Sequence, residues 1–299
     1  EGMFMDGLIY SSVSNNLANG IGSCWNLVFS ETLFHSFYEH PPLAFWIQSL
    51  FFMIFGEHYI IEKIYSLFTF LTTGYIIVLI WKELTGNKSF GWIPLLLWVV
   101  IPNTTWSAPN NILENTMSIW ICLSVWLYLK SFNKKSLLLV GLSGFMIFLS
   151  FMTKGFTGLF TLSVPFFYWI IIKEFRFRKF LSDTLILLLF TILPFLLLMI
   201  ISEQARDYFQ NYIDIQVLNS IHHVQTVDSG WSFIAEWFHE LQPAIAITII
   251  IIVIALFRKT QIRHLLKHKK QVIIFVFIGL AGFLPMLVSL KLRNFYLNK

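Results

Sequence analysis

The sequence has few charged residues and few cysteines, and both shortages narrow the class of protein to which it can belong. Only 12% of its 299 residues are Asp, Glu, Lys or Arg, about half the share of a typical soluble domain. This excludes a disordered chain and a soluble nucleic-acid-binding protein. Two cysteines, Cys24 and Cys122, cannot build the disulfide framework of a small secreted scaffold. Hydrophobic residues, at 57% with 32 Phe and 11 Trp, predict a polytopic membrane protein instead.

Neither end of the sequence has the pattern expected at the end of a domain. It begins with Glu1, shows no signal peptide, and stops at Lys299 directly after a polar and aromatic cluster. Internal repeats and low-complexity tracts are not evident. We therefore expect a single transmembrane domain over residues 1–299 with elements missing at both ends, as a fragment of a longer protein or a processed form.

Eight apolar segments are candidates for membrane-spanning helices, because crossing a bilayer takes about 20 mostly apolar residues. We therefore expect an all-α transmembrane bundle of about eight spans. A ninth segment, 42–55, is shorter, rich in Trp and Phe, and follows Pro41-Pro42. We interpret it as a juxtamembrane helix, with a short span as the alternative. The eight candidates are 59–81, 90–102, 111–129, 136–152, 156–172, 181–201, 243–257 and 271–290.

Lysine and arginine gather in alternate loops, which indicates the sidedness of the spans. The positive-inside rule assigns the loops that carry them to the cytoplasm. By parity, segments 1–58 and 202–242 then lie on the outer side. Fifteen of the 21 cations fall in the segments 82–89, 130–135, 173–180 and 258–270.

The two long outer segments are predicted to contain surface helices. Residues 1–17 have helical character, and within 203–220 a single face is expected to collect Phe209, Tyr212, Ile213 and Val217. Such a pattern is typical of a helix that lies along the membrane surface. Because loops of this length usually carry function, we expect the functional site on this side.

Lys154 breaks the apolar pattern on the outer side, since it stands between two predicted spans in Phe151-Met-Thr-Lys-Gly-Phe156. It can be an anchor whose ammonium reaches the interface. Alternatively, it binds a lipid phosphate, with Gly155 letting a backbone or a head group come close. Lys291 and Arg293 follow the last span at the same predicted level. The three cations together would form an anion site.

Two carboxylates are further candidates. Asp6 opens the first outer segment, where it can also be an ordinary solvated or helix-capping residue. Glu114 lies near the outer end of the span 111–129. An ionisable residue at that depth is a functional hypothesis by default, although a bond to Asn110 or between helices explains it equally well.

Glu39 and His40 directly precede the rigid Pro41-Pro42 turn, which fixes the position of their side chains. A divalent metal held by Glu39, His222 and His223 is one alternative. The spacing matches no zinc pattern, and adjacent histidines on a helix point in different directions.

Taken in order, several short motifs resemble those of the C-type superfamily of membrane glycosyltransferases. The branch that the chain resembles contains bacterial aminoarabinose transferases of lipid A and protein O-mannosyltransferase-like enzymes. The resemblance extends over nearly the whole chain and lies in the order and spacing of the motifs. These are Asp6…Tyr10, Pro41-Pro42-Leu43 with Trp46 after it, Phe55-Gly56, Thr153-Lys154-Gly155 and Lys291…Tyr296.

The resemblance implies transfer of a sugar from a polyprenyl-phosphate donor to a lipid, glycan or protein acceptor. It implies that Asp6 is the catalytic base, acting with inversion at the anomeric carbon. At two positions this sequence departs from the family pattern. Gly7 replaces the usual Glu after the Asp, and His40 replaces the usual Lys before the Pro-Pro pair.

The resemblance also implies a set of binding residues. We expect the donor phosphate to contact Lys154, Lys291, Arg293 and His40, and the substrates to contact Tyr10, Glu39, Glu114 and Tyr296. No cofactor is expected to be required and nucleic acid is not an expected partner, whereas membrane lipids are.

The expected location is a bacterial inner membrane, with the active site facing the periplasm. A transporter or flippase of lipid-linked sugars and a non-catalytic membrane scaffold are the competing interpretations. The glycosyltransferase hypothesis requires Asp6 and Lys154 to face one cavity on the outer side.

Overall fold

The computed structural model describes residues 3–30, 32, 35–86, 90–172, 175–218, 232–257 and 269–288, and within these residues it contains helices and no β-strand. This confirms the all-α class. The helices are α1 Met5–Ala18, α2 Leu43–Phe55, α3 Ile60–Thr85, α4 Trp92–Val99, α5 Pro102–Ser107, α6 Leu113–Lys134, α7 Leu137–Lys154, the 3₁₀ helix η1 Gly155–Ser163, α8 Val164–Ile171, α9 Phe177–Ile201, α10 Glu203–Asn211, the π-helix η2 Tyr212–Leu218, α12 Ser232–Phe257 and α14 Lys269–Val288.

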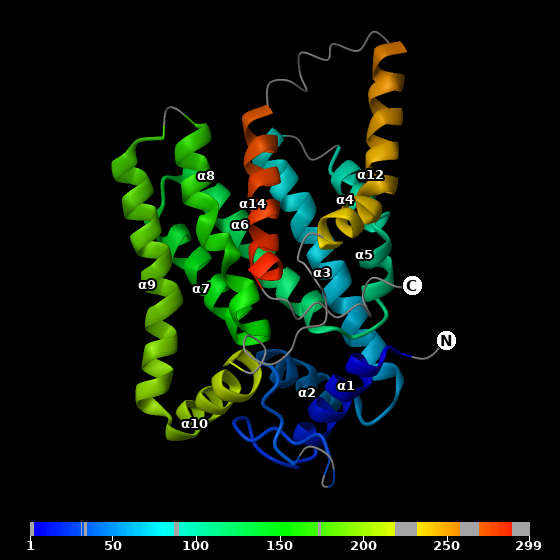
Figure 1. Ribbon diagram of the computed structural model, residues 1–299, viewed down its shortest axis with the longest axis vertical. Coiled ribbons are helices and arrows are strands. Elements are labelled where there is room, and N and C mark those ends of the chain that lie inside the picture. The colour runs from blue at the N-terminus through cyan, green and yellow to red at the C-terminus, as the bar shows by residue number, and fades with distance from the viewer. Residues whose placement is uncertain are drawn as a thin grey trace.

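The helices form an upright bundle with a layer of shorter helices across one end (Figure 1). The bundle contains α3, α6, α7, α8, α9 and α14, whereas α1, α2 and α10 lie at the lower end in this view. The opposite ends of α3, α6 and α9 carry Lys82, Lys134 and Lys179. The basic loops of the described chain therefore share one end and the layer of short helices occupies the other, as the alternation of charge predicts.

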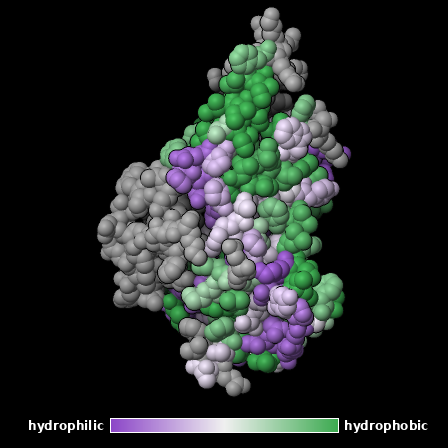
Figure 2. Space-filling model, turned by 90° about the vertical axis from the view of Figure 1, so that its right-hand side faces the viewer, coloured by the Kyte–Doolittle hydropathy of each residue, from purple (hydrophilic) through white to green (hydrophobic). Residues whose placement is uncertain are grey.

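Among the described residues, three helical stretches are long and apolar enough to cross a membrane: Ile60–Thr85, Leu137–Ile171 and Phe177–Ile201. On α9 most apolar side chains are exposed, among them Leu185, Leu189 and Ile200. Apolar side chains exposed over a whole helix are suited to lipid rather than water. Figure 2 shows a broad apolar surface on another face of the molecule, interrupted by hydrophilic patches. The described chain is thus that of an integral membrane protein.

The expected count of eight spans is not supported. Over 90–102 the structure has only the eight-residue helix α4, which is about 12 Å long at 1.5 Å per residue. Ile101 is extended, and Pro102 begins the separate helix α5. The prediction of one span there is wrong, because proline cannot continue the preceding helix but fits the first turn of a new one.

The stretch Leu137–Ile171 doubles back on itself at Gly155. This residue has a φ of +74°, which ends α7. A Cβ atom on Gly158 would lie only 2.3 Å from the Ser150 hydroxyl, so η1 packs directly against α7. Residues 153–155 are therefore a turn between two antiparallel segments, as the sequence predicts.

Small residues let the central helices approach closely. The hydroxyls of Ser124 on α6 and Ser143 on α7 lie 3.0 Å apart. Thr191 on α9 donates to the Gly144 carbonyl of α7 at 3.0 Å, and a Cβ on Gly144 would lie 2.7 Å from the Leu187 carbonyl oxygen. Such contacts are a usual source of helix association in membranes, where burial of apolar surface gives no driving force.

An aromatic cluster holds the layer of short helices together and to the bundle. Its buried members include Tyr10, Phe37, Phe45, Tyr208 and Phe209. Further contacts come from Phe148 and Met152 near the lower end of α7. The layer therefore has its own core, continuous with α7.

The predicted surface helices are present, with one error of detail. Helix α2 has 13 residues, about 20 Å, which is shorter than the ~30 Å hydrocarbon core and favours the juxtamembrane interpretation. In α10 and η2, Phe209 and Tyr212 are buried as expected, but Ile213 is exposed. The widened turn of the π-helix shifts the buried face, and this shift is not visible in a 3.6-residue pattern.

Candidate functional site

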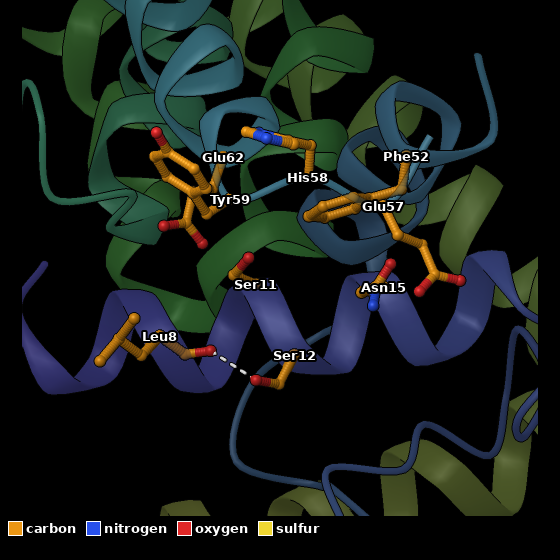
Figure 3. Close-up of a pocket in the computed structure, with 9 residues that line it drawn as sticks. All are labelled: Leu8, Ser11, Ser12, Asn15, Phe52, Glu57, His58, Tyr59 and Glu62. Carbon is orange, nitrogen blue, oxygen red and sulfur yellow. Dashed lines mark hydrogen bonds between the residues drawn. The ribbon is translucent and has the colours of Figure 1, made fainter. Parts of the chain in front are cut away.

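Helix α1 is buried on one side and lines a pocket on another. Asp6, Tyr10 and Val13 are buried, and Tyr10 and Val13 belong to the aromatic cluster. Leu8, Ser11, Ser12 and Asn15 instead line an open pocket of about 260 Å³ (Figure 3). The candidate base and this pocket thus lie on different sides of one helix.

The start of α1 is fastened to the segment that precedes α6. The Phe4 amide donates to the Asn110 side-chain oxygen at 2.8 Å, and the Asn111 side-chain amide donates to the Gly7 carbonyl at 3.2 Å. The rings of Phe4 and Trp106 pack edge to face at 5.2 Å. These contacts fix Asp6, in the first turn of α1, next to the segment that leads to Glu114.

Gly7 is required by this close approach. A Cβ atom at residue 7 would lie 2.0 Å from the backbone oxygen of Asn110. A glutamate, which the resembled family commonly has at this position, would therefore force the two segments apart. The departure from the family pattern has a packing cause in this chain.

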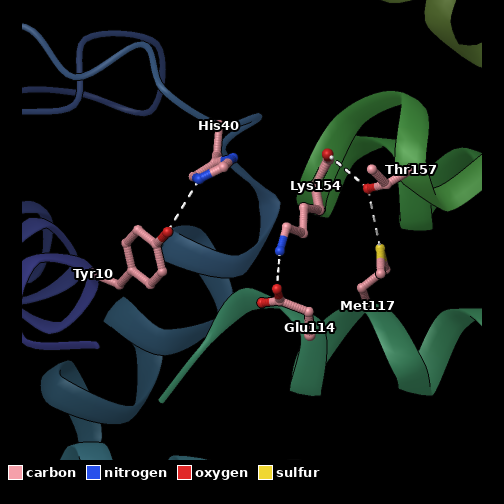
Figure 4. Close-up of polar contacts among 6 residues, drawn as sticks. All are labelled: Tyr10, His40, Glu114, Met117, Lys154 and Thr157. Carbon is pink, nitrogen blue, oxygen red and sulfur yellow. Dashed lines mark hydrogen bonds and ion pairs between the residues drawn. The ribbon is translucent and has the colours of Figure 1, made fainter. Parts of the chain in front are cut away.

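Tyr10 and His40, both predicted to contact substrate, contact each other. The Tyr10 hydroxyl and His40 Nε2 are 3.1 Å apart (Figure 4). The His40 carbonyl accepts a 2.7 Å hydrogen bond from Tyr208 of α10, and Tyr208 also donates to the Phe37 carbonyl at 3.2 Å. Burial raises the pKa of Tyr208, so its phenol stays protonated and able to donate. Glu39 is half-buried beside this network.

Lys154 and Glu114 form an ion pair that joins the end of α7 to the start of α6 (Figure 4). Their side chains are 19% and 35% exposed, so the pair is reachable from outside. Lys154 is the last residue of α7, where the helix dipole favours a cation. Thr157 donates to the Lys154 carbonyl at 3.2 Å and approaches the Met117 sulfur at 3.7 Å. Of the alternatives for Glu114, the interhelical bond is the one observed.

Gly155 lets a side chain of another helix come close. A Cβ on Gly155 would lie 1.9 Å from the Tyr212 hydroxyl oxygen, so the phenol of η2 rests on the glycine that follows Lys154. Burial raises the pKa of Tyr212 to about 12, which keeps this phenol neutral at ordinary pH. Tyr212 therefore brings an uncharged hydroxyl next to the residue that carries the ammonium.

Several predicted site residues lie outside the described residues: Lys291, Arg293, Tyr296, His222 and His223. Their expected roles remain predictions, as does the metal alternative that depends on the two histidines. The requirement that Asp6 and Lys154 face one cavity is also untested, since the 260 Å³ pocket is lined by neither residue.

Sequence reasoning missed a buried carboxylate in the bundle. Asp183 of α9 is fully buried, and its oxygens accept from the Lys179 ammonium at 2.9 Å and from the Tyr128 hydroxyl at 3.1 Å. The available signal was a charged residue inside the predicted span 181–201, which by itself indicates a pairing or functional role.

Sequence reasoning also missed the acidic side of the pocket. Glu57, His58 and Glu62 lie in and just after the short link from α2 to α3. Their sequence has the ordinary pattern of a polar loop, and only the folded chain places them opposite α1.

The arrangement supplies the groups that a group-transfer reaction needs. A half-buried ammonium can neutralise an anionic leaving group, and a buried carboxylate in the first turn of α1 can accept a proton. The segment 106–114 connects the two, since its Asn111 side chain donates to the Gly7 carbonyl and it carries Glu114 three residues later.

A search of solved structures finds a similar fold. The apo crystal structure of ArnT from Cupriavidus metallidurans matches with a TM-score of 0.63 at 16% identity, over 97% of this chain and 56% of ArnT. At this identity the match concerns the fold alone.

Two curated proteins are similar in sequence. An uncharacterized protein of Aquifex aeolicus is 28% identical over 156 residues, which are 50% of this chain and 30% of that protein. The undecaprenyl phosphate-alpha-4-amino-4-deoxy-L-arabinose arabinosyl transferase of Wigglesworthia glossinidia brevipalpis is 25% identical over 150 residues, 48% of this chain and 26% of the transferase. Each match therefore spans less than a third of the relative.

The sequence model of one family, described as dolichyl-phosphate-mannose-protein mannosyltransferase, matches residues 39–201. The matched region begins at Glu39, includes the Lys154–Glu114 ion pair, and ends with α9. Since it covers more than half of the 299 residues and agrees with the resemblance in the motifs, the chain belongs to the dolichyl-phosphate-mannose-protein mannosyltransferase family of membrane glycosyltransferases.

Proposed function

We propose that this protein transfers a sugar from a polyprenyl-phosphate donor to a hydroxyl acceptor on the non-cytoplasmic face of a bacterial inner membrane. The observation that carries the proposal is the Lys154–Glu114 ion pair, which lies inside the family-matched region at the ends of two helices. A named relative, the arabinosyl transferase of Wigglesworthia, uses a lipid-linked sugar.

The position of the ion pair favours an enzyme over a transporter. Transporters usually hold their substrates near the bilayer midplane, on interrupted helices. Lys154 instead ends α7 and Glu114 stands in the first turn of α6. The end of α7 and the start of α6 point toward the layer of short helices (Figure 1), where a lipid head group would lie.

In the proposed reaction the donor phosphate displaces Glu114 as the partner of Lys154. The bond between the anomeric carbon and the phosphate oxygen breaks, and its electron pair leaves with the polyprenyl phosphate. Lys154 stabilises the charge on that leaving group. The acceptor oxygen forms the new bond to the anomeric carbon from the opposite side, with inversion. Its proton passes to Asp6.

The test uses the full-length protein in lipid nanodiscs with polyprenyl-phosphate sugars, and measures release of polyprenyl phosphate. Asp6→Asn is expected to lower kcat by about 10²–10⁴-fold, the usual contribution of a general base. Lys154→Gln is expected to lower kcat/KM by about 10- to 100-fold, because a hydrogen bond to a charged group is lost.

Lys130→Gln is the matched control, since Lys130 packs over the Trp126 ring near the C-terminal end of α6, at the other end of this helix from Glu114. All three variants should retain the unfolding temperature of the wild type to within a few degrees. Wild-type turnover by Asp6→Asn removes Asp6 as the base. Equal effects of Lys154→Gln and Lys130→Gln remove Lys154 from the donor site.

A further inference from the structure

The pocket beside α1 has no role in the reaction proposed above. It lies between α1 and the link from α2 to α3, and Figure 3 shows its side chains converging from these two sides. Glu57, His58 and Tyr59 on its rim are exposed, so the pocket opens to the surface. Its volume of about 260 Å³ is just below the ~300–1,000 Å³ of sites for drug-sized ligands, and suits one small ligand.

The floor of the pocket contains a hydroxyl that is not hydrogen-bonded to any other described residue. Ser11 is only 7% exposed as a residue, lines the pocket, and points from α1 toward Glu62 (Figure 3). Its neighbours Ser12 and Ser14 differ, because their hydroxyls donate to backbone carbonyls of α1 at 2.9 Å and 2.8 Å. The Ser11 hydroxyl faces the open pocket, where a ligand hydroxyl could bond to it.

The charges of the pocket select the class of ligand. Glu57 and Glu62 contribute two carboxylates, and none of the nine lining residues is Lys or Arg. A phosphate would be repelled here, in contrast to the site at Lys154. Carboxylates accept hydrogen bonds from hydroxyls and bind amines more strongly, because the bond is then charge-assisted.

Two aromatic side chains, Tyr59 and His58, lie at the rim of the same pocket. Tyr59 is 74% exposed, and its ring packs on that of His58 at 4.4 Å with an interplanar angle of 35°. His58 Nδ1 accepts from the Ile60 amide at 3.3 Å, which helps to hold the pair in place. An exposed tyrosine offers an apolar face and a polar edge, and a sugar ring has both.

We propose that this pocket binds a single sugar unit that carries free hydroxyls and an amine, and that it discriminates against phosphorylated sugars. This sugar site is separate from the reaction proposed above, because it lies on a different side of α1 from Asp6. The amine pairs with Glu62, a hydroxyl bonds to Ser11, and the ring packs against Tyr59.

The test is a binding titration of the full-length protein in nanodiscs, without any lipid-linked donor. Glucosamine, glucose and glucose 6-phosphate are the probes, and saturation-transfer NMR reports their affinities. Glucosamine is expected to bind more tightly than glucose by about threefold to tenfold, the range for a partly exposed charged hydrogen bond. Glucose 6-phosphate is expected to bind more weakly than glucose.

Two variants and a matched control locate the site. Glu62→Gln should remove most of the preference for glucosamine over glucose. Ser11→Ala should lower the affinity for both sugars. Glu83→Gln makes the same change as Glu62→Gln about 30 Å along the same helix, where Glu83 accepts from the Asn133 side chain. It should bind as the wild type does.

The proposal is overturned if glucosamine does not bind the wild type, if glucose 6-phosphate binds as well as glucosamine, or if Glu62→Gln behaves like Glu83→Gln. Because no donor is present, these outcomes are independent of transfer.

Discussion

Replacing Gly155 by alanine tests the contact on which the geometry next to Lys154 depends. Gly155 has φ +74° and ψ −144°, a conformation that is available almost only to glycine and costs another residue about 1–3 kcal/mol. The new methyl would also lie 1.9 Å from the Tyr212 hydroxyl oxygen. Overpacking of this kind costs about 1–3 kcal/mol. The expected loss of unfolding free energy is therefore about 2–6 kcal/mol.

Gly56→Ala separates the two contributions. Gly56 has a similar backbone conformation, with φ +85° and ψ 179°, but a Cβ there would meet nothing within 4 Å. Gly56→Ala should therefore lower the unfolding free energy only through its backbone conformation, by about 1–3 kcal/mol. The difference between the variants then measures the crowding against Tyr212.

The assay is reversible unfolding in mixed detergent micelles, applied to both single variants and to Gly155→Ala combined with Tyr212→Phe. Removing the phenol oxygen leaves the ring carbon Cζ 3.0 Å from the methyl, so the double variant should recover about 1 kcal/mol or more. Equal losses for Gly155→Ala and Gly56→Ala, without recovery in the double variant, would refute the packing of η2 against the end of α7.

Two further predictions concern the rest of the described chain. Gly7→Ala should lower the unfolding free energy by about 1–3 kcal/mol, because the new Cβ would lie 2.0 Å from the Asn110 carbonyl oxygen. Gly279→Ala is the control and should be neutral or stabilising, since a Cβ there would meet nothing within 4 Å. Equal melting curves for the two variants would contradict the contact between α1 and the segment before α6. Asp183→Ala should lower the unfolding free energy by about 1–3 kcal/mol, since it leaves the buried Tyr128 hydroxyl without its acceptor. Asp183→Asn keeps an acceptor and should lower the unfolding free energy by less. Chemical denaturation of both variants measures the two losses, and a larger loss for Asp183→Asn would contradict the prediction.

Local composition was sufficient to predict most of the helices. Apolar runs located α3, α6, α7 and α9 to within a few residues, because a membrane-spanning helix must be apolar over most of its length. Boundaries were less accurate where polar residues continue a helix. The first predicted span ends at residue 81, but α3 continues to Thr85 and stops at Gly86, whose φ of +71° makes it the C-terminal cap. The available signal was Lys82 in the last turn of the helix, followed four residues later by Gly86.

The candidate site was predictable only in part, because its contacts join residues distant in sequence. Lys154 was identified as an unusual cation, but its partner Glu114 lies 40 residues earlier. No local pattern indicates that Tyr212 packs on Gly155, or that Ser11 and Glu62 line one pocket. These pairings follow from how the helices pack, which a single sequence does not specify.

The hydrogen bonds from Tyr208 to Phe37 and His40 join residues that are 171 and 168 positions apart. A ribosome that adds about 5–20 residues per second needs roughly 10–35 seconds to synthesise the chain between them. The helices α3, α6, α7 and α9 are all synthesised in that interval, so α1 and α2 lack their partner α10 until it ends. The layer that carries Asp6 and His40 is therefore completed only after these four helices have been made.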